Sequence, residues 1–133
     1  MTHAPQREPI GDHVRVKGGV PVFPQAVRWG NLVFCSGQAP VDPDTLMVTS
    51  DDFESQARFV LEKTFAILRQ ARSAPEHVVS VDCYLARAED FGRWNDLYVE
   101  HFPTPRPART TLVSDLVVPG MLVEIRVIAG VPE

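Results

Sequence analysis

Apolar residues recur at intervals of three and four in two stretches of the chain, which is the spacing of helices that pack one face on a core. The longer stretch predicts a helix over residues 52–72, with Asp51 as its N-cap and Glu54 completing a capping box. The shorter stretch predicts a helix over residues 90–102, which Pro103 ends. The expected buried face of the first helix comprises Phe53, Ala57, Val60, Leu61, Thr64, Phe65, Leu68 and Ala71, and that of the second comprises Phe91, Trp94, Leu97 and Tyr98.

Other stretches alternate between apolar and polar residues or are bounded by turn formers, as is typical of strands. The predicted strands cover residues 14–17, 25–29, 32–36, 78–86, 108–114 and 121–129. Gly30-Asn31 is expected to form a tight hairpin turn, and Pro119-Gly120 to join the last two strands. Within residues 78–86, the expected buried face is Val79, Val81, Cys83 and Leu85.

The order of strands, helix, strand, helix and strands predicts an α+β sandwich in which two helices cover one face of a sheet. The chain is expected to form one domain over residues 1–133, with residues 1–12 as a loose N-terminal arm. On the last strand, Met121, Val123, Ile125, Val127 and Ala129 are expected to face the helices. The other face carries Glu124 and Arg126 beside Leu122 and Ile128. An apolar sheet face without helices predicts contact with another subunit.

Composition narrows the class of protein. Of the 133 residues, 44% are hydrophobic and 23% are charged, as in ordinary globular proteins. No apolar run is long enough to span a membrane and no secretory signal begins the chain, so we expect a cytoplasmic protein. The net charge of −4 and the absence of a basic run disfavour nucleic acid as a partner.

The spacing of the cysteines and histidines does not indicate a metal site or a catalytic site. Cys35 and Cys83 lie in predicted strands, where a small buried hydrophobe is the main interpretation and a reactive thiol the alternative. The four histidines show no ligand spacing with one another or with the cysteines. We therefore expect no metal and no cofactor.

Charged and polar residues near the C-terminus suggest a site. Arg109 and Thr111 lie two apart on one predicted strand, so their side chains share a face, and an arginine there can hold a carboxylate through two hydrogen bonds. Strand pairing is expected to bring Glu124 beside Arg109, where a partly desolvated carboxyl could act on a water. The alternative is a structural ion pair between Arg109 and Glu124 at a subunit interface.

Two further places offer weaker evidence of a site. Ser36 and Gly37 end a strand and could donate backbone hydrogen bonds to an oxyanion, or could form an ordinary exit from the strand. Asn95, on the second helix, could line a site or be a solvated helix residue.

The chain resembles the RidA/YjgF family of imine deaminases. The resemblance rests on the stretches WGNLVFCSGQAPVDPDT, RWNDLYVEHFPTPRPARTTL and VEIRVIA, and it runs in order from about residue 14 to residue 129. It implies a chorismate-mutase-like fold and a homotrimer, a barrel of sheets with the helices outside and sites between subunits. It also implies that Arg109 holds the carboxylate of a 2-imino or 2-enamino acid, that Glu124 positions or activates water, and that Ser36 and Asn95 line the cleft.

The same resemblance implies hydrolysis to a 2-oxo acid and ammonia without a cofactor, an activity that protects pyridoxal-phosphate enzymes from reactive intermediates. Two expected site residues differ from common family residues: Phe23 stands where a tyrosine is frequent, and Thr111 where a cysteine is frequent. A larger substrate such as an aminomuconate is therefore an alternative. A non-catalytic module that binds small carboxylates and an RNA-acting protein are the rival functions.

Overall fold

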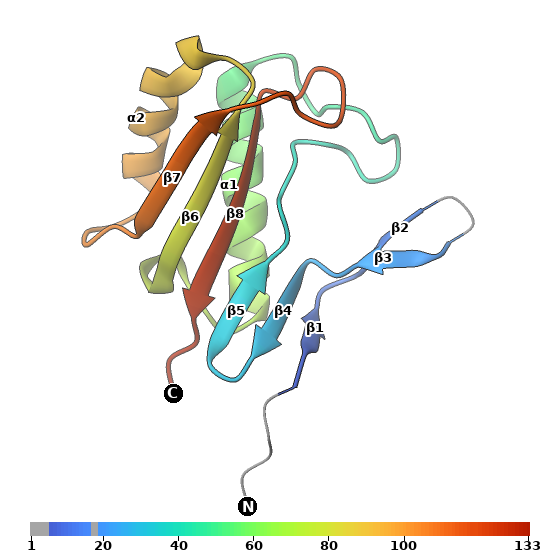
Figure 1. The fold of residues 1–133 in the computed structure, drawn as a ribbon, viewed down its shortest axis with the longest axis vertical. Helices are drawn as coiled ribbons and strands as arrows, with labels where there is room; N and C mark the ends of the chain where they lie inside the picture. Colours follow the sequence, from blue (N-terminus) through green and yellow to red (C-terminus); the bar gives the residue numbers. More distant parts are fainter. Residues whose placement is uncertain (1–5, 17–18) are drawn as a thin grey trace, which may run out of the picture.

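The computed structural model describes residues 6–16 and 19–133 and places two helices on one face of a six-stranded sheet (Figure 1). The strands of this sheet are β1 (Glu8–Ile10), β4 (Ala26–Trp29), β5 (Leu32–Cys35), β6 (Val78–Leu85), β7 (Ala108–Val113) and β8 (Val123–Gly130). The helices are α1 (Phe53–Gln70) and α2 (Phe91–His101). Two short 3-10 helices precede β6 and α2, respectively: η1 (Pro75–His77) and η2 (Ala88–Asp90). The predicted α+β sandwich with a mainly antiparallel sheet is confirmed.

The strands lie in the order β1-β4-β5-β8-β6-β7, and only β6 and β7 are parallel. Strand β6 therefore separates β7 from β8, and the prediction that these last two strands pair with each other is wrong. The reason is α2, which carries the chain back along the sheet so that β7 runs parallel to β6 at the edge of the sheet. Strand β8 then pairs on the other side of β6.

Helix α1 covers the centre of the sheet with the buried face that its periodicity predicts. Its N-cap is Asp52, whose carboxylate accepts a hydrogen bond from the backbone N–H of Ser55 at 2.9 Å. The predicted cap at Asp51 is therefore wrong by one residue. Both aspartates are chemically suited to the position, and the backbone decides between them.

Gln56 is a fully buried polar side chain on α1. Its amide nitrogen donates to the carbonyls of Ser50 (2.7 Å) and Gly120 (2.9 Å), and its amide oxygen accepts from the N–H of Leu122 (2.7 Å). Gln56 thereby fastens both the loop before α1 and the loop before β8 to the helix. These bonds use both amide N–H donors and give the amide oxygen a partner, which offsets the cost of burying the group.

The start of β6 differs from the predicted alternation. Val78 is buried at 6% exposure, whereas Val79, expected on the dry face, is 53% exposed. The register with β8 shifts between Val78 and Ser80, as at a β-bulge. The extra residue places Val78 on the buried face and Val79 on the exposed one, the reverse of the predicted alternation. From Val81 onward the predicted alternation holds.

The N-terminal region is more ordered than expected where it is described. Within the predicted loose arm of residues 1–12, β1 pairs with β4 as an edge strand, so that prediction is wrong for residues 8–10; residues 1–5 lie outside the described part. Strands β2 (Val14–Arg15) and β3 (Pro21–Phe23) form a separate hairpin that projects beside the sheet (Figure 1). The predicted end of the first strand at Lys17 and half of the Gly18-Gly19 turn lie outside the described residues.

The remaining elements begin and end within about two residues of the predicted bounds. The Gly30-Asn31 turn is confirmed: Trp29 pairs with Leu32 across it, and Gly30 has a φ of 60°. In residues 6–16 and 19–133, neither helix has the length and apolarity needed to cross a bilayer.

Candidate functional site

Arg109 lies on the edge strand β7 and is held against α2. Its Nε donates to the Thr111 hydroxyl at 2.7 Å, and its Nη2 donates to the side-chain oxygen of Asn95 at 2.6 Å. The guanidinium carbon lies 4.6 Å from the ring centroid of Tyr98 and 5.8 Å from that of Phe91. The structure thus brings together three predicted site residues, and Asn95 is a partner of Arg109 and not merely a solvated helix residue.

Every side chain that contacts the Arg109 guanidinium in this way is neutral. No carboxylate lies within 4.0 Å of it among residues 6–16 and 19–133, and the hydroxyl, amide oxygen and aromatic ring leave its charge uncompensated. Two of its N–H groups are engaged within the chain, which leaves the others for a ligand. A part-buried, oriented and uncompensated arginine is well suited to bind a carboxylate.

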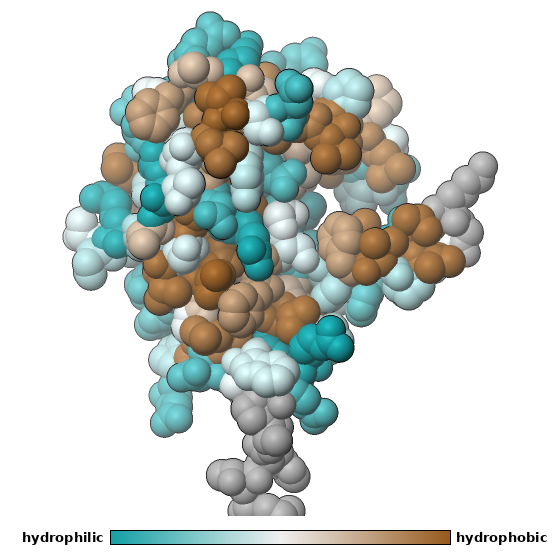
Figure 2. All heavy atoms as spheres, in the orientation of Figure 1, coloured by the Kyte–Doolittle hydropathy of each residue, from teal (hydrophilic) through white to brown (hydrophobic). Residues whose placement is uncertain are grey.

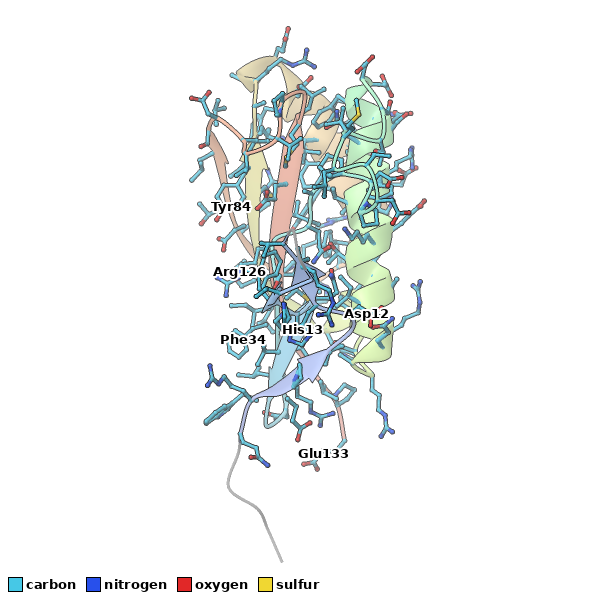
Figure 3. The ribbon with its side chains drawn as sticks, turned by 90° about the vertical axis from the view of Figure 1, so that its right-hand side faces the viewer. Asp12, His13, Phe34, Tyr84, Arg126 and Glu133 are labelled. Carbon is cyan, nitrogen blue, oxygen red and sulfur yellow. The ribbon has the colours of Figure 1, made fainter. Side chains whose placement is uncertain are left out.

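Glu124 lies elsewhere, in a cleft of about 260 Å³ on the sheet face that the helices do not cover. Gly37, Tyr84 and Arg126 line the cleft with Glu124, and the loop of residues 114–117 closes one side. In Figure 3, Tyr84 and Arg126 extend from the side of the sheet opposite the helices. The cleft therefore combines a carboxyl group, a phenol and a guanidinium.

Partial burial raises the pKa of the Glu124 carboxyl above its ordinary value. The carboxyl lies directly against Gly37, because a Cβ at position 37 would overlap the end of the Glu124 side chain. A larger residue at position 37 would therefore displace the Glu124 carboxyl from its place in the cleft. A carboxyl with a raised pKa is a suitable proton donor and acceptor near neutral pH.

Glu124→Gln should raise the free energy of unfolding at neutral pH. Because the folded pKa of Glu124 is raised, the stability that this group contributes is full below the ordinary carboxyl pKa of about 4.3 and is lost as the pH rises through the folded pKa. The free energy of unfolding of the variant should therefore exceed that of the wild type by a larger amount at pH 7.5 than at pH 4.

Urea unfolding at both pH values measures this difference. Glu62→Gln, at an exposed position on α1, is the control and should show no such change between the two pH values. A stability difference for Glu124→Gln that is the same at both pH values would contradict the assignment of a raised pKa.

Ser36 and Gly37 follow β5 and differ in what they can donate. The Ser36 hydroxyl donates to the carbonyl of Pro24 at 2.7 Å, and its N–H donates to the carbonyl of Gln25 at 2.9 Å. Ser36 therefore holds the end of β5 to the segment that precedes β4, and its N–H is not available to an oxyanion. The Gly37 N–H has no hydrogen-bond partner within the described ranges and remains available.

Phe23 lies at the end of the β2–β3 hairpin and is 41% exposed. It immediately precedes Pro24, so the Ser36 hydrogen bond places it near the end of β5. It does not line the cleft of Glu124. Within one chain, Phe23 therefore joins neither the Arg109 group nor the Glu124 group.

Arg109 and Glu124 lie on opposite faces of the sheet. Arg109 pairs with Val81 of β6, whose side chain is buried under the helices. Glu124 pairs with Tyr84, which points to the uncovered face. Because paired residues share a face, the expectation that strand pairing brings Arg109 beside Glu124 is wrong within one chain.

The uncovered face of the sheet carries apolar residues beyond the cleft. Register places Val27 and Trp29 of β4 beside Phe34 and Leu32 of β5, with Ile128 of β8 next to Phe34. Figure 2 shows brown side chains gathered over the lower part of this face and on the β2–β3 hairpin. The predicted face without helices is therefore present, and it is apolar.

Both cysteines are buried and unlinked. Burial raises the pKa of Cys35 to about 12 and that of Cys83 to about 11. A thiol with such a pKa stays protonated at neutral pH and is a poor nucleophile. The structural interpretation of the cysteines is therefore favoured over the reactive one.

The sequence reasoning missed Tyr98 as the ring beneath Arg109, and Tyr84 and Arg126 as cleft residues. Phe91, Asn95 and Tyr98 follow one another at spacings of four and three, which places them on one face of α2. That spacing is the available signal, but the periodicity of apolar residues assigns Phe91 and Tyr98 to the core face and leaves Asn95 apart from them. Phe91 is in fact 47% exposed.

Comparison with known proteins gives a consistent result. Residues 20–131 match the family model described as Endoribonuclease L-PSP. A RutC family protein of Pyrococcus abyssi is 35% identical over 80% of this chain and 84% of its own length.

Solved structures agree with these sequence matches. A member of the Rid protein family from Yersinia pestis has a TM-score of 0.81 at 31% identity, covering 95% of this chain and all of the other. RidA from an Antarctic Psychrobacter has a TM-score of 0.79 at 31% identity, covering 93% and 99%.

Proposed function

The chain belongs to the Endoribonuclease L-PSP family, which is the RidA/YjgF family, and from this premise we propose that it hydrolyses reactive 2-imino and 2-enamino acids to 2-oxo acids and ammonia. The observation that carries the proposal is the environment of Arg109. Its guanidinium is oriented by Thr111, Asn95 and Tyr98 and is compensated by no carboxylate in the described residues. This arrangement suits the carboxylate that every such substrate has next to its C=N bond.

We place the complete site between the subunits of a homotrimer. The Arg109 group lies at the sheet edge on the helix side, and the Glu124 cleft lies on the uncovered face. One chain therefore cannot offer both groups to one small molecule. Because the uncovered face is apolar, a second copy of the chain is a suitable partner to pack on it. In that assembly, Arg109 of one subunit would lie near Glu124 of the next.

The hydrolysis needs positioning and proton transfer more than a strong nucleophile. Arg109 binds the substrate carboxylate, which fixes the electrophilic imine carbon. A water adds to this carbon of the protonated imine as Glu124 accepts one of its protons, so that a C–O bond forms, the C=N π bond breaks and a neutral carbinolamine results. Glu124 returns that proton to the nitrogen, the C–N bond breaks, and the hydroxyl proton passes to the departing ammonia, so that the 2-oxo acid and ammonium are released.

Glu124 suits this exchange because its raised pKa eases the change between carboxyl and carboxylate. The available N–H of Gly37, next to the Glu124 side chain, is a candidate donor to charge that develops on the attacking oxygen. Phe23 and Thr111 would shape the walls of the pocket without taking part in the proton transfer.

The test is release of 2-oxo acid and ammonia from imines that an amino-acid oxidase generates in situ from alanine and leucine. The wild-type protein should accelerate release over spontaneous hydrolysis. Arg28→Gln should retain that acceleration, because Arg28 on β4 bonds to the carbonyl of its own turn at Gly30 and lies outside both residue groups.

Two results would overturn the proposed function. Binding of 2-oxo acids without any acceleration would identify a module that binds small carboxylates. Cleavage of RNA, which the family description names, together with inert imines would identify a ribonuclease. The net charge of −4 disfavours the ribonuclease.

A further inference from the structure

Arg126 lies in the Glu124 cleft and is not used by the proposed mechanism. It follows Glu124 by two residues on β8, so both side chains leave the same face of the sheet. Both line the cleft with Tyr84 and Gly37. Figure 3 shows Arg126 below Tyr84 on the side of the sheet away from the helices.

The contacts of Arg126 leave most of its guanidinium available. Its Nε donates to the carbonyl of Cys35 at 3.3 Å, and the residue is otherwise exposed. Asp82 is its cross-strand partner on β6 and Asp115 lines the same cleft, yet neither carboxylate lies within 4.0 Å of it. Within the described chain, Arg126 thus carries a charge that no ion pair compensates.

The position of Arg126 relative to Glu124 sets the size of ligand it can reach. Residues two apart on a strand have Cα atoms about 7 Å apart, and their side chains leave the same face with roughly that spacing. A substrate side chain with two carbons ending in a carboxylate covers this span when a hydrogen bond of about 2.9 Å is added. A ligand whose reacting carbon lies near Glu124 can therefore place a second acidic group on Arg126.

From this geometry we infer that the site prefers 2-imino acids that carry a second carboxylate, and that Arg126 is the residue that determines this specificity. The inference rests on the proposed function, in which Arg109 binds the carboxylate next to the imine. The two arginines then bind opposite ends of one dicarboxylic substrate, with Glu124 acting between them. A substrate with an apolar side chain would leave Arg126 without a partner.

The competing explanation is that Arg126 only balances the charge of Asp82 across the strands. An exposed cross-strand pair contributes little to stability, and here the two groups do not form an ion pair within 4.0 Å. The two explanations also predict different effects of substitution. Charge balance predicts similar results for Arg126→Gln and Asp82→Asn, whereas substrate binding predicts an effect of Arg126→Gln on diacids alone.

The kinetic test compares imines generated from glutamate with imines generated from norvaline, which has the same chain length without the second carboxylate. The wild-type ratio of kcat/KM, diacid over monoacid, should exceed one, and Arg126→Gln should lower that ratio about tenfold. Arg28→Gln is the matched control, because that arginine lies on the same sheet outside the cleft and should leave the ratio unchanged. An unchanged ratio for Arg126→Gln, or an equal fall for Asp82→Asn, would overturn the inference.

A binding test separates this inference from the proposed function. Calorimetry compares 2-oxoglutarate with 2-oxopentanoate, which are the two products and stable analogues of the two imine substrates. If no imine is hydrolysed, the proposed function fails, but Arg126-dependent preference for 2-oxoglutarate would still support the second anion site. If imines are hydrolysed and neither substrates nor analogues show an Arg126-dependent preference, the inference alone fails.

Discussion

Replacing Arg109 with alanine is expected to lower kcat/KM for 2-imino acids by about a hundredfold to a thousandfold. The variant loses the group that fixes the substrate carboxylate and hence the position of the imine carbon. Arg109→Lys should be intermediate, because lysine keeps the charge but cannot reproduce the bonds to Thr111 and Asn95 in the same geometry.

The fold of these variants should persist, since Arg109 is partly exposed at an edge strand and makes no ion pair among the described residues. Circular dichroism and the oligomeric state of each variant establish this point. Arg28→Ala is the control arginine and should retain wild-type kcat/KM. Full activity of a folded Arg109→Ala variant would show that this arginine does not bind the substrate.

Gln56→Leu should lower the free energy of unfolding by about 3 kcal/mol, the largest stability effect that we expect of one polar residue here. Leucine fits the buried volume roughly but makes none of the three hydrogen bonds to Ser50, Gly120 and Leu122. Those backbone groups would lose their partners, and the loop before β8 would lose its anchor on α1. Urea unfolding at a fixed protein concentration measures the change, because an oligomer's stability depends on concentration.

Gln70→Leu is the matched control for this substitution. Gln70 ends the same helix but is exposed, so its replacement should change the free energy of unfolding by less than about 0.5 kcal/mol. If Gln56→Leu were as mild as Gln70→Leu, water would have to satisfy the three backbone groups in the variant. The network would then be dispensable for stability.

Periodicity in the sequence identified most elements because each buries one face. The α1 stripe and the alternation of β8 are long and regular, and the structure buries the residues that they predict. The prediction of faces failed at the start of β6, because one inserted residue at the bulge exchanges Val78 and Val79 between the two faces of the sheet. Strand β1 was missed because three residues that include a proline give no alternation to recognise.

Strand partners were harder to predict than strand faces. Alternation states which side chains of β7 and β8 face the helices, but it does not state which strands are neighbours. The turn at Pro119-Gly120 suggested a hairpin, whereas β6 lies between the two strands. The predicted juxtaposition of Arg109 and Glu124 failed because β6 lies between their strands and because their side chains leave opposite faces of the sheet.

The sequence predicted the identities of several site residues better than it predicted how these residues are arranged in space. Arg109, Thr111 and Asn95 do meet, although 14 residues separate Asn95 from Arg109. The spacing on α2 predicts core packing for Tyr98, because spacing on a helix cannot distinguish a core aromatic ring from one that supports a cation. For Arg126, the sequence predicted only the face of β8 from which its side chain leaves. The cleft around it could not be predicted, because residues 114–117, which follow β7, form one of its walls.

A subunit-mixing experiment tests most directly the claim that Arg109 and Glu124 of different chains complete one site. Arg109→Ala and Glu124→Gln are each expected to be inactive. Refolded together in equal amounts, they should regain about a quarter of wild-type activity, because each mixed cyclic trimer contains one interface with both residues intact. Activity no greater than that of the separate variants, in trimers shown to be mixed, would contradict a site shared between subunits.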